Sequence, residues 1–270
     1  MTNLKIFCVS DIPLNNLENL DLDLVGVGKK TFSSKYISCN DGINIQNKEQ
    51  YYSELTFHFW FWKNMLPEFN DNTWIGFCQK RRFWIKENSS SINNIEDLKK
   101  NLLREIPKKW EQYDAFICDP IRVSPVKKIK MIKKGWRNLL KDPSIFFNKN
   151  KQNLKLQFDM FHGHGILEKA IKIISHDDKK DFMNYINNKT ELNPHIMFIA
   201  KKKLLKKWFE SLFDWLFECE KIFGFKDLVG YDTQRIYSFL TERYMPFWFE
   251  KYSKVKYWPW VYCDVTKIKN

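Results

Sequence analysis

The stretch WIGFCQKRRFW, residues 74–84, decides the fold because an apolar run turns abruptly into three adjacent cations. Its first half is short and apolar enough for a buried strand, and Lys80, Arg81 and Arg82 follow it. In an open α/β sheet the carboxyl ends of strands form the crevice where ligands bind. Cations there suit a diphosphate, because a guanidinium group matches phosphate oxygens. The alternative is a strand that runs out into a solvated basic turn.

The composition indicates a folded protein with a polyanionic partner. A chain of 270 residues can bury a substantial core, and its 44% hydrophobic and 17% aromatic content exclude a disordered chain. The net charge of +13 predicts binding to nucleic acid, an anionic membrane or phosphorylated substrates. Six scattered cysteines fit a reducing compartment, and no run reaches the roughly 20 apolar residues of a membrane span. We therefore expect a soluble, cytoplasmic protein.

Apolar runs that alternate with helical patterns predict one α/β domain. The first expected strand, residues 5–10, ends at a polar turn that contains Asp11. The further expected strands are residues 24–27, 74–84, 114–119 and 195–200. The expected helices are residues 51–64, 94–110, 127–141, 166–174, 203–223 and 234–249. The tail, residues 251–270, is basic and aromatic, and we expect it to pack across the surface.

Charged side chains inside the most apolar helices are candidate functional groups. Glu54 lies in a nearly all-apolar helical pattern, so it must face a cationic partner or a cleft. Arg235, Glu242 and Arg243 stand among aromatic residues, where a charge needs pairing or a ligand. An ion pair within the protein is the alternative for each of them.

The stretch QFDMFHGHG, residues 157–165, concentrates Asp159, His162 and His164. Two histidines at i and i+2 without a third ligand nearby form a weak metal motif. The pattern favours a structural histidine or one that contacts substrate.

Residues 127–141, KKIKMIKKGWRNLLK, combine six lysines and one arginine with aliphatic side chains and Trp136. This composition is typical of a helix that binds a membrane surface or another polyanion. A solvated basic helix is the alternative.

Several of these blocks, taken in order, resemble a family of small glycosyltransferases from bacterial capsule and O-antigen clusters. That family was long catalogued as a domain of unknown function and is linked to galactofuranosyl transfer. Residues 52–64 are similar to its Y-C-E-L-T-x-x-Y-W-I-W-K-N block, and residues 75–83 resemble V-G-L-C-H-Y-R-R-Y. The other similarities are residues 114–120 to Y-D-I-I-L-P, Gln157 with His162 to Q-Y-x-x-x-H, residues 197–199 to N-M-F-I, and Arg235 with residues 239–243 to R-x-F-G-F-L-S-E-R.

The chain also departs from the family pattern at several positions. These are Gln79-Lys80 in place of His-Tyr, Ile196 in place of Asn, Ser238 in place of Gly and Gln46 in place of Ser.

The resemblance implies a GT-A-like α/β fold with a mixed central sheet and a helical C-terminal extension. It implies an inverting transfer of a hexosyl residue, galactofuranose, from a UDP-sugar to a saccharide or lipid-linked saccharide acceptor in surface polysaccharide synthesis. On this reading residues 1–125, approximately, bind the nucleotide sugar and residues 126–270 bind the acceptor. The protein would work in the cytoplasm, at the inner face of the membrane where a lipid-linked acceptor lies.

Within that resemblance, the three cations take the place of a metal ion. GT-A enzymes usually hold a divalent ion with an Asp-x-Asp after the strand that meets the donor diphosphate, and here a cationic stretch follows that strand. We expect these side chains to stabilise the leaving UDP without a metal, and Asp119 is the alternative ligand for manganese or magnesium. The expected donor-binding residues are Asp11, Glu54, Lys80, Arg81, Arg82, His162, Arg235 and Arg243.

An inverting transfer also needs a general base for the acceptor hydroxyl. Glu242 is the first candidate, Asp159 the second and Glu54 the third. A basic protein that binds nucleic acid or scaffolds a membrane surface without catalysis is the alternative function. Since no nucleic-acid-binding motif accompanies the charge, we expect no nucleic-acid partner.

Overall fold

The computed structural model describes residues 3–123, 128–174 and 176–267. The chain divides into two compact units, and each unit is built from more than one segment of the chain. The first unit comprises Met1–Asp119, His195–Glu210 and Phe249–Asn270, and the second comprises Pro120–Pro194 and Ser211–Trp248. The first boundary lies close to the expected division near residue 125. The expectation of a single domain stays a prediction.

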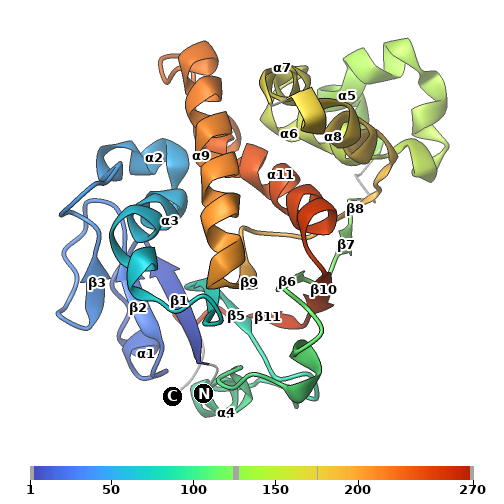
Figure 1. Ribbon diagram of the computed structural model, residues 1–270. Helices are drawn as coiled ribbons and strands as arrows, with labels where there is room; N and C mark the ends of the chain where they lie inside the picture. The colour runs from blue at the N-terminus through green and yellow to red at the C-terminus, as the bar shows by residue number, and fades with distance from the viewer. Residues whose placement is uncertain (1–2, 124–127, 175, 268–270) are drawn as a thin grey trace. The chain divides into compact units, whose positions relative to one another are not determined.

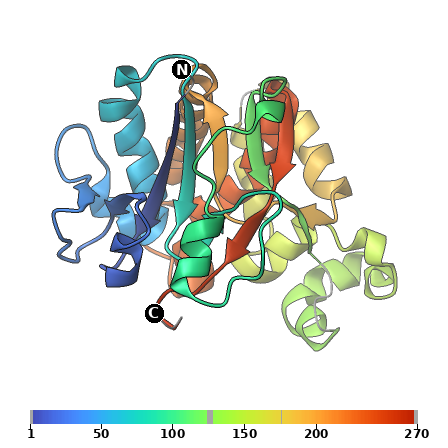
Figure 2. The same cartoon turned by 90° about the horizontal axis from the view of Figure 1, so that it is seen from below.

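A mixed sheet forms the centre of the first unit (Figures 1 and 2). Its strand order is β10-β6-β9-β4-β1-β2-β3, and β9 runs antiparallel to both of its neighbours while the other pairs along this path are parallel. The strands are β1 (Leu4–Ser10), β2 (Asp23–Gly26), β3 (Tyr36–Ser38), β4 (Trp74–Gln79), β6 (Ala115–Cys118), β9 (Phe198–Lys201) and β10 (Val255–Trp258). Two short strands, β5 (Arg82–Trp84) and β11 (Trp260–Tyr262), pair with each other beside β4.

The expectation of one strand over residues 74–84 was wrong, because this stretch forms a tight hairpin. Strand β4 ends at Gln79, the chain turns at Lys80 and Arg81, and Arg82 pairs back with Gln79. The backbone N–H of Lys80 still donates to the carbonyl of Val9 at 3.0 Å, so the turn begins on the ladder with β1. The three cations therefore occupy the tip of a hairpin at the carboxyl end of a buried strand.

The C-terminal tail also differs from the expectation that it would pack across the surface. Residues 255–258 form β10, which pairs in parallel with β6, and residues 260–262 form β11. Aromatic and β-branched residues such as Val255, Tyr257 and Val261 fit a pleated, half-buried edge. The tail is part of the sheet.

The helix expected over residues 51–64 is interrupted, and the one expected over 94–110 is short. Ser53 has a φ of 52°, which separates α2 (Glu49–Tyr52) from α3 (Leu55–Trp60). The helix continues as a π-helical turn over Phe61–Met65. Helix α4 (Ile95–Asn101) ends because Leu103 donates its backbone N–H to Trp84 instead.

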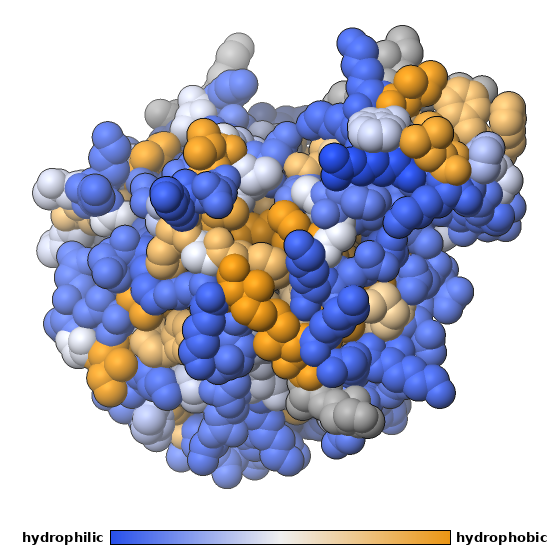
Figure 3. Space-filling model, turned by 90° about the horizontal axis from the view of Figure 1, so that it is seen from above, coloured by the Kyte–Doolittle hydropathy of each residue, from blue (hydrophilic) through white to orange (hydrophobic). Residues whose placement is uncertain are grey.

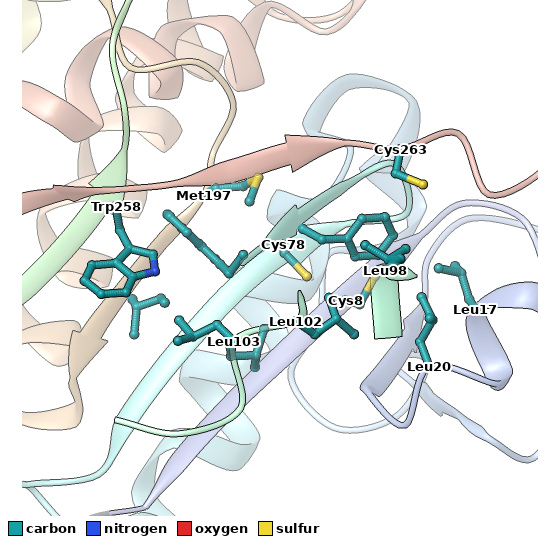
Figure 4. Close-up of a cluster of buried hydrophobic side chains, with 14 of the residues drawn as sticks. Cys8, Leu17, Leu20, Cys78, Leu98, Leu102, Leu103, Met197, Trp258 and Cys263 are labelled. Atoms are coloured by element: carbon teal, nitrogen blue, oxygen red, sulfur yellow. The ribbon is translucent and has the colours of Figure 1, made fainter. Parts of the chain in front are cut away.

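The two faces of the sheet carry different parts of the core. On one face, Phe7 and Phe77 pack in an aromatic cluster against Phe57 of α3 and Phe209 of α9 (Lys202–Phe223). On the other face, Cys8 and Cys78 belong to an apolar cluster (Figure 4). The cluster also contains Leu98 of α4 and Leu102 and Leu103, which follow that helix. The alternation of these neighbours along β1 and β4 is the period of two expected for strands.

The second unit is mainly helical. Its helices and strands are β7 (Ile121–Arg122), α5 (Lys128–Lys141), α6 (Leu154–His162), α7 (Ile166–Ile173), α8 (His176–Asn188), β8 (Glu191–Leu192), α10 (Tyr231–Gln234) and part of α9 and of α11 (Ile236–Tyr252). A short α1 (Asn15–Glu18) belongs to the first unit, and the 3-10 turns are Gln46–Lys48, Leu66–Glu68, Lys108–Trp110, Pro143–Phe146 and Lys149–Lys151. Over the described residues, the helices fall short of the length and apolarity that crossing a bilayer requires.

One buried histidine in the first unit lies in an aromatic cage. The His58 ring on α3 is 1% exposed, and its centroid lies 4.4 Å from that of Phe77 and 5.6 Å from that of Phe198. Its Nδ1 has no hydrogen-bond partner among the described residues. Burial lowers the pKa of His58 to about 3, so the ring is neutral at pH 7.

This histidine predicts a specific loss of stability in acid. Because its pKa is lower in the folded state than in the unfolded state, its contribution is complete above about pH 6.5 and is lost as the pH falls toward 3. Between pH 7.5 and pH 5.5, the wild type should therefore lose free energy of unfolding that the His58→Phe variant keeps. We expect the two losses to differ by on the order of 1 kcal/mol. Urea titrations at the two pH values measure this, and equal losses would contradict it.

Candidate functional site

The carboxyl ends of the parallel strands gather several of the expected site residues at one edge of the first unit's sheet. Asp11 directly follows β1, Lys80 follows β4 and Asp119 follows β6. Strands β1 and β4 are paired in parallel, with Val9 opposite Gln79. This is the edge at which open α/β sheets bind ligands.

Each of the three hairpin cations is held by a polar group. Lys80 forms an ion pair with Asp11, and Arg81 Nε lies 3.3 Å from Asp264 Oδ1. Arg82 donates from Nη1 to Gln79 Oε1 at 3.0 Å, whereas its buried Nε has no hydrogen-bond partner among the described residues. All three cations are half-buried. The hairpin is therefore a fixed cationic surface, which answers the alternative of a freely solvated turn.

Glu54 joins this cluster through Gln79. It stands at the amino end of α3 and accepts a hydrogen bond from Gln79 Nε2. The other amide atom of Gln79, Oε1, accepts a hydrogen bond from Arg82 Nη1. Gln79 is one of the positions at which the chain departs from the family pattern, and it links the carboxylate to the guanidinium. The structure thus brings Asp11, Glu54 and the three cations together around the tip of the hairpin.

A histidine that sequence analysis did not assign to the site lies beside this group. His195 precedes β9 with a φ of 66°, and its ring centroid is 5.1 Å from that of Trp260 on β11. Burial, and secondarily the charge of Arg82, lower the pKa of His195 to about 3. The Arg82 guanidinium also lies 5.8 Å from the Tyr262 ring. Arg82 therefore lies near one aromatic ring and near a neutral histidine that packs against a second ring.

Possible metal ligands are not clustered in the part of the chain that the structure describes. The described residues contain no group of three histidine, cysteine or acidic side chains placed to hold an ion. The single Asp-x-Asp of the sequence, Asp21 and Asp23, lies at the amino end of β2, where Lys99 and Lys5 pair with the two carboxylates. Asp119 lies at the carboxyl edge of the sheet, away from this Asp-x-Asp. The residue is exposed, and the partial burial of its carboxyl group raises its pKa.

In the second unit, Arg243 of α11 is the centre of a buried polar group. Its side chain is 1% exposed, Nη1 lies 3.0 Å from Glu242 Oε2, and Nη2 donates to Gln157 Oε1 on α6. Its Nε has no hydrogen-bond partner among the described residues. Burial lowers the pKa of Arg243, and the neighbouring Glu242 carboxylate opposes that shift. Glu242 itself is 20% exposed, so its carboxylate reaches solvent.

His162 belongs to the same neighbourhood. Its Nδ1 lies 2.8 Å from the backbone carbonyl of Asp232, and its ring stacks on Phe239 with centroids 3.8 Å apart. Burial lowers the pKa of His162 to about 4, and the charge of Arg243 adds to the effect. The ring is therefore neutral at pH 7, and its contact with the carbonyl assigns the proton to Nδ1.

Asp159 is buried and fully engaged. Its Oδ1 accepts the backbone N–H of Gly165 at 2.9 Å, and its Oδ2 lies 3.4 Å from His164 Nδ1 and 3.5 Å from Lys155 Nζ. These contacts fix the turn between α6 and α7, where Gly165 has a φ of 78°.

Arg235 lies over the Tyr231 ring at 5.4 Å.

The expected site residues thus fall into two sets. Asp11, Glu54 and the hairpin cations belong to the first unit, and the others belong to the second. The second set comprises Asp159, His162, Arg235, Glu242 and Arg243. The structure places the two sets in different units, and the assignment of donor and catalytic roles to them stays a prediction.

Comparison with known proteins gives one family and one solved structure. The family model described as "Domain of unknown function (DUF4422)" matches residues 10–254. The chain is similar to the apo structure of the WbbM bifunctional glycosyltransferase, with a TM-score of 0.69 and 18% sequence identity. The match covers 97% of this chain and 45% of that one, so the chain spans less than half the length of that protein. No curated protein matches. The likeness confirms the expected GT-A-like α/β fold with a mixed central sheet.

Proposed function

We propose that this chain, which belongs to the DUF4422 family, is a glycosyltransferase that moves a hexosyl residue from a UDP-sugar to a saccharide acceptor. The observation that carries the proposal is the fixed cluster of Lys80, Arg81 and Arg82 at the ligand-binding edge of the sheet. The glycosyltransferase fold of the structural relative supports it.

The hairpin cations would hold the donor diphosphate and stabilise the charge that develops on the leaving UDP. Arg82 is best suited to this role, because its Nε is buried without a partner and its neighbour Gln79 orients the guanidinium. Lys80 and Arg81 already pair with Asp11 and Asp264, so they contribute pre-organised charge. Fixed charge of this kind needs no rearrangement when the glycosidic bond breaks.

Glu242 would act as the general base that removes the proton from the acceptor hydroxyl. The Arg243 guanidinium lies 3.0 Å from the Glu242 carboxylate and orients it, and the Glu242 side chain is 20% exposed. Asp159 ranks second because its two oxygens are already engaged in the α6–α7 turn. Glu54 ranks third because it accepts a hydrogen bond from Gln79 in the donor group. His162 and Arg235 would contact the sugar or phosphate.

The finer parts of the proposal follow from the family resemblance. We assign galactofuranose as the transferred sugar and a saccharide of bacterial capsule or O-antigen, free or lipid-linked, as the acceptor. We place the inverting, metal-independent reaction in the cytoplasm. The similarity of residues 52–64 and 75–83 to the galactofuranosyltransferase blocks supports the sugar.

Thermal unfolding with candidate donors tests this function. UDP, UDP-galactose and UDP-galactofuranose would each be added with EDTA and with manganese. A ligand at about 100 times its dissociation constant stabilises the native state by about 2.7 kcal/mol, so the melting temperature should rise by several degrees in EDTA. A rise only with manganese would contradict the metal-free donor site. No response to any of these ligands, together with salt-sensitive binding of a random oligonucleotide, would favour a nucleic-acid-binding protein.

A further inference from the structure

Helix α5 of the second unit has an inner face that is already packed. Met131 is 1% exposed and belongs to a small apolar cluster with Leu156 and Met160 of α6. Gly135 lies on the same face, where a Cβ would stand 3.2 Å from Met160. Leu139 also packs against this cluster. Met131, Gly135 and Leu139 therefore pack this face of α5 against the rest of the unit.

The helix carries a second apolar stripe on its outer side. Ile132, Trp136 and Leu140 recur every four residues and are 54%, 49% and 74% exposed. Phe147, shortly after the helix, is 80% exposed. At the upper right of Figure 3, apolar side chains lie exposed among hydrophilic ones over the part of the second unit that contains α5. Large apolar groups that gather on one surface mark an interaction site.

A cationic stripe runs beside the apolar one. Lys133, Arg137 and Lys141 follow Ile132, Trp136 and Leu140 by one residue each, and all three are exposed. The sequence of α5 contains no acidic residue. The acid that follows it, Asp142, pairs with Lys151 at 2.7 Å. The outer surface therefore joins apolar side chains to positive charge, and the neighbouring Lys134 pairs with Asp232 at 3.2 Å.

We propose that this outer face of α5 docks the protein on the surface of an anionic lipid bilayer. The helix would lie in the plane of the interface, with Ile132, Trp136 and Leu140 among the acyl chains and Lys133 and Arg137 at the anionic headgroups. A helix with an apolar stripe beside a basic one has the arrangement that interfacial helices use. Both stripes contribute, since binding grows with buried apolar area and with each cation near the charged surface.

Vesicle flotation with the 270-residue chain tests this surface. Vesicles of phosphatidylcholine containing about 30% phosphatidylglycerol are compared with phosphatidylcholine alone. We expect the wild type to bind the anionic vesicles and to lose that binding at high salt. Trp136→Ser with Leu140→Ser should weaken binding at least tenfold, and Lys133→Gln with Arg137→Gln about 20-fold. Ile222→Ser is the matched control, because Ile222 is equally exposed, at 59%, on α9.

The variants are first compared with the wild type by circular dichroism melts, and exposed positions should leave the melting temperature unchanged. Equal vesicle binding by the wild type and both double variants would overturn the proposal. So would a wild type that ignores vesicles, or one that forms dimers through this face which Trp136→Ser with Leu140→Ser dissociates. Donor stabilisation by UDP is measured separately, so failure of the bilayer site and failure of the transferase function are distinguishable.

Discussion

The Arg82→Gln variant is expected to lose the thermal stabilisation that UDP gives the wild type and to transfer sugar about 10²- to 10³-fold more slowly. Arg82 contributes a fixed charge and a buried, unpartnered Nε at the ligand-binding edge, and glutamine keeps a polar side chain without the charge. Because the charge of Arg82 helps to lower the pKa of His195, the variant should also raise that pKa from about 3. Ligand-dependent melting, initial rates and NMR titration of His195 measure these three effects.

Arg122→Gln is the control, because Arg122 on β7 is 80% exposed at the side chain and lies outside the hairpin. It should leave UDP stabilisation and transfer unchanged. Arg81→Ala should also abolish the UDP response, but it removes the ion pair with Asp264 and is expected to lower stability as well. An Arg82→Gln variant that keeps the full UDP response would show that the hairpin does not bind the diphosphate.

The Glu242→Gln variant is expected to lose about 10²- to 10⁴-fold in kcat while UDP still raises its melting temperature. In the wild type, Arg243 Nη1 lies 3.0 Å from the Glu242 carboxylate, and the glutamine amide keeps an oxygen that can accept the same hydrogen bond. The amide cannot take a proton from the hydroxyl group of the acceptor saccharide. Single-turnover rates with donor and acceptor measure the loss. Addition of the donor alone reports whether binding is intact.

A matched control separates catalysis from the ion pair. Glu250→Gln changes a second carboxylate of α11, one that accepts from Tyr257, and it should leave kcat unchanged. Removing one partner of a buried ion pair costs about 3 to 5 kcal/mol, so a purely structural Glu242 would show a lower melting temperature with an unchanged rate. That outcome would return the role of base to Asp159 or Glu54.

Several regular elements of the fold could be predicted because their apolar residues either follow a helical period or form a short continuous run. The expected helix over residues 203–223 corresponds to α9, and the strand over residues 114–119 corresponds to β6. The predicted boundaries of helices and strands were wrong where the backbone of a single residue leaves the regular conformation. The positive φ of Ser53 divides a helix, and the positive φ of His195 delays β9 until Phe198. Such backbone states are set by tertiary contacts, which no local pattern records.

The candidate site could be predicted in its residue types but not in its connections. The cations of the hairpin stood out because three charges follow an apolar run. Asp11 was also expected at the site, but Asp264 was not, and neither pairing could be predicted because both aspartates are distant in the chain from Lys80 and Arg81 and meet them only when the sheet forms. His195 gave no distinct pattern within its apolar run. Its altered pKa arises from burial and from Arg82, which folding brings near it.

Strand β10 has a consequence for how the protein is made. Val255 pairs with Ala115 in register, so one end of the sheet waits for a segment synthesised about 140 residues after its partner. At translation rates of about 5 to 20 residues per second, that delay is several seconds. During it, β6 lacks its outer neighbour on the ribosome, and the hairpin lacks Asp264. The nascent chain therefore exposes an unpaired strand edge, which is a target for chaperones, until residues 255–264 have emerged.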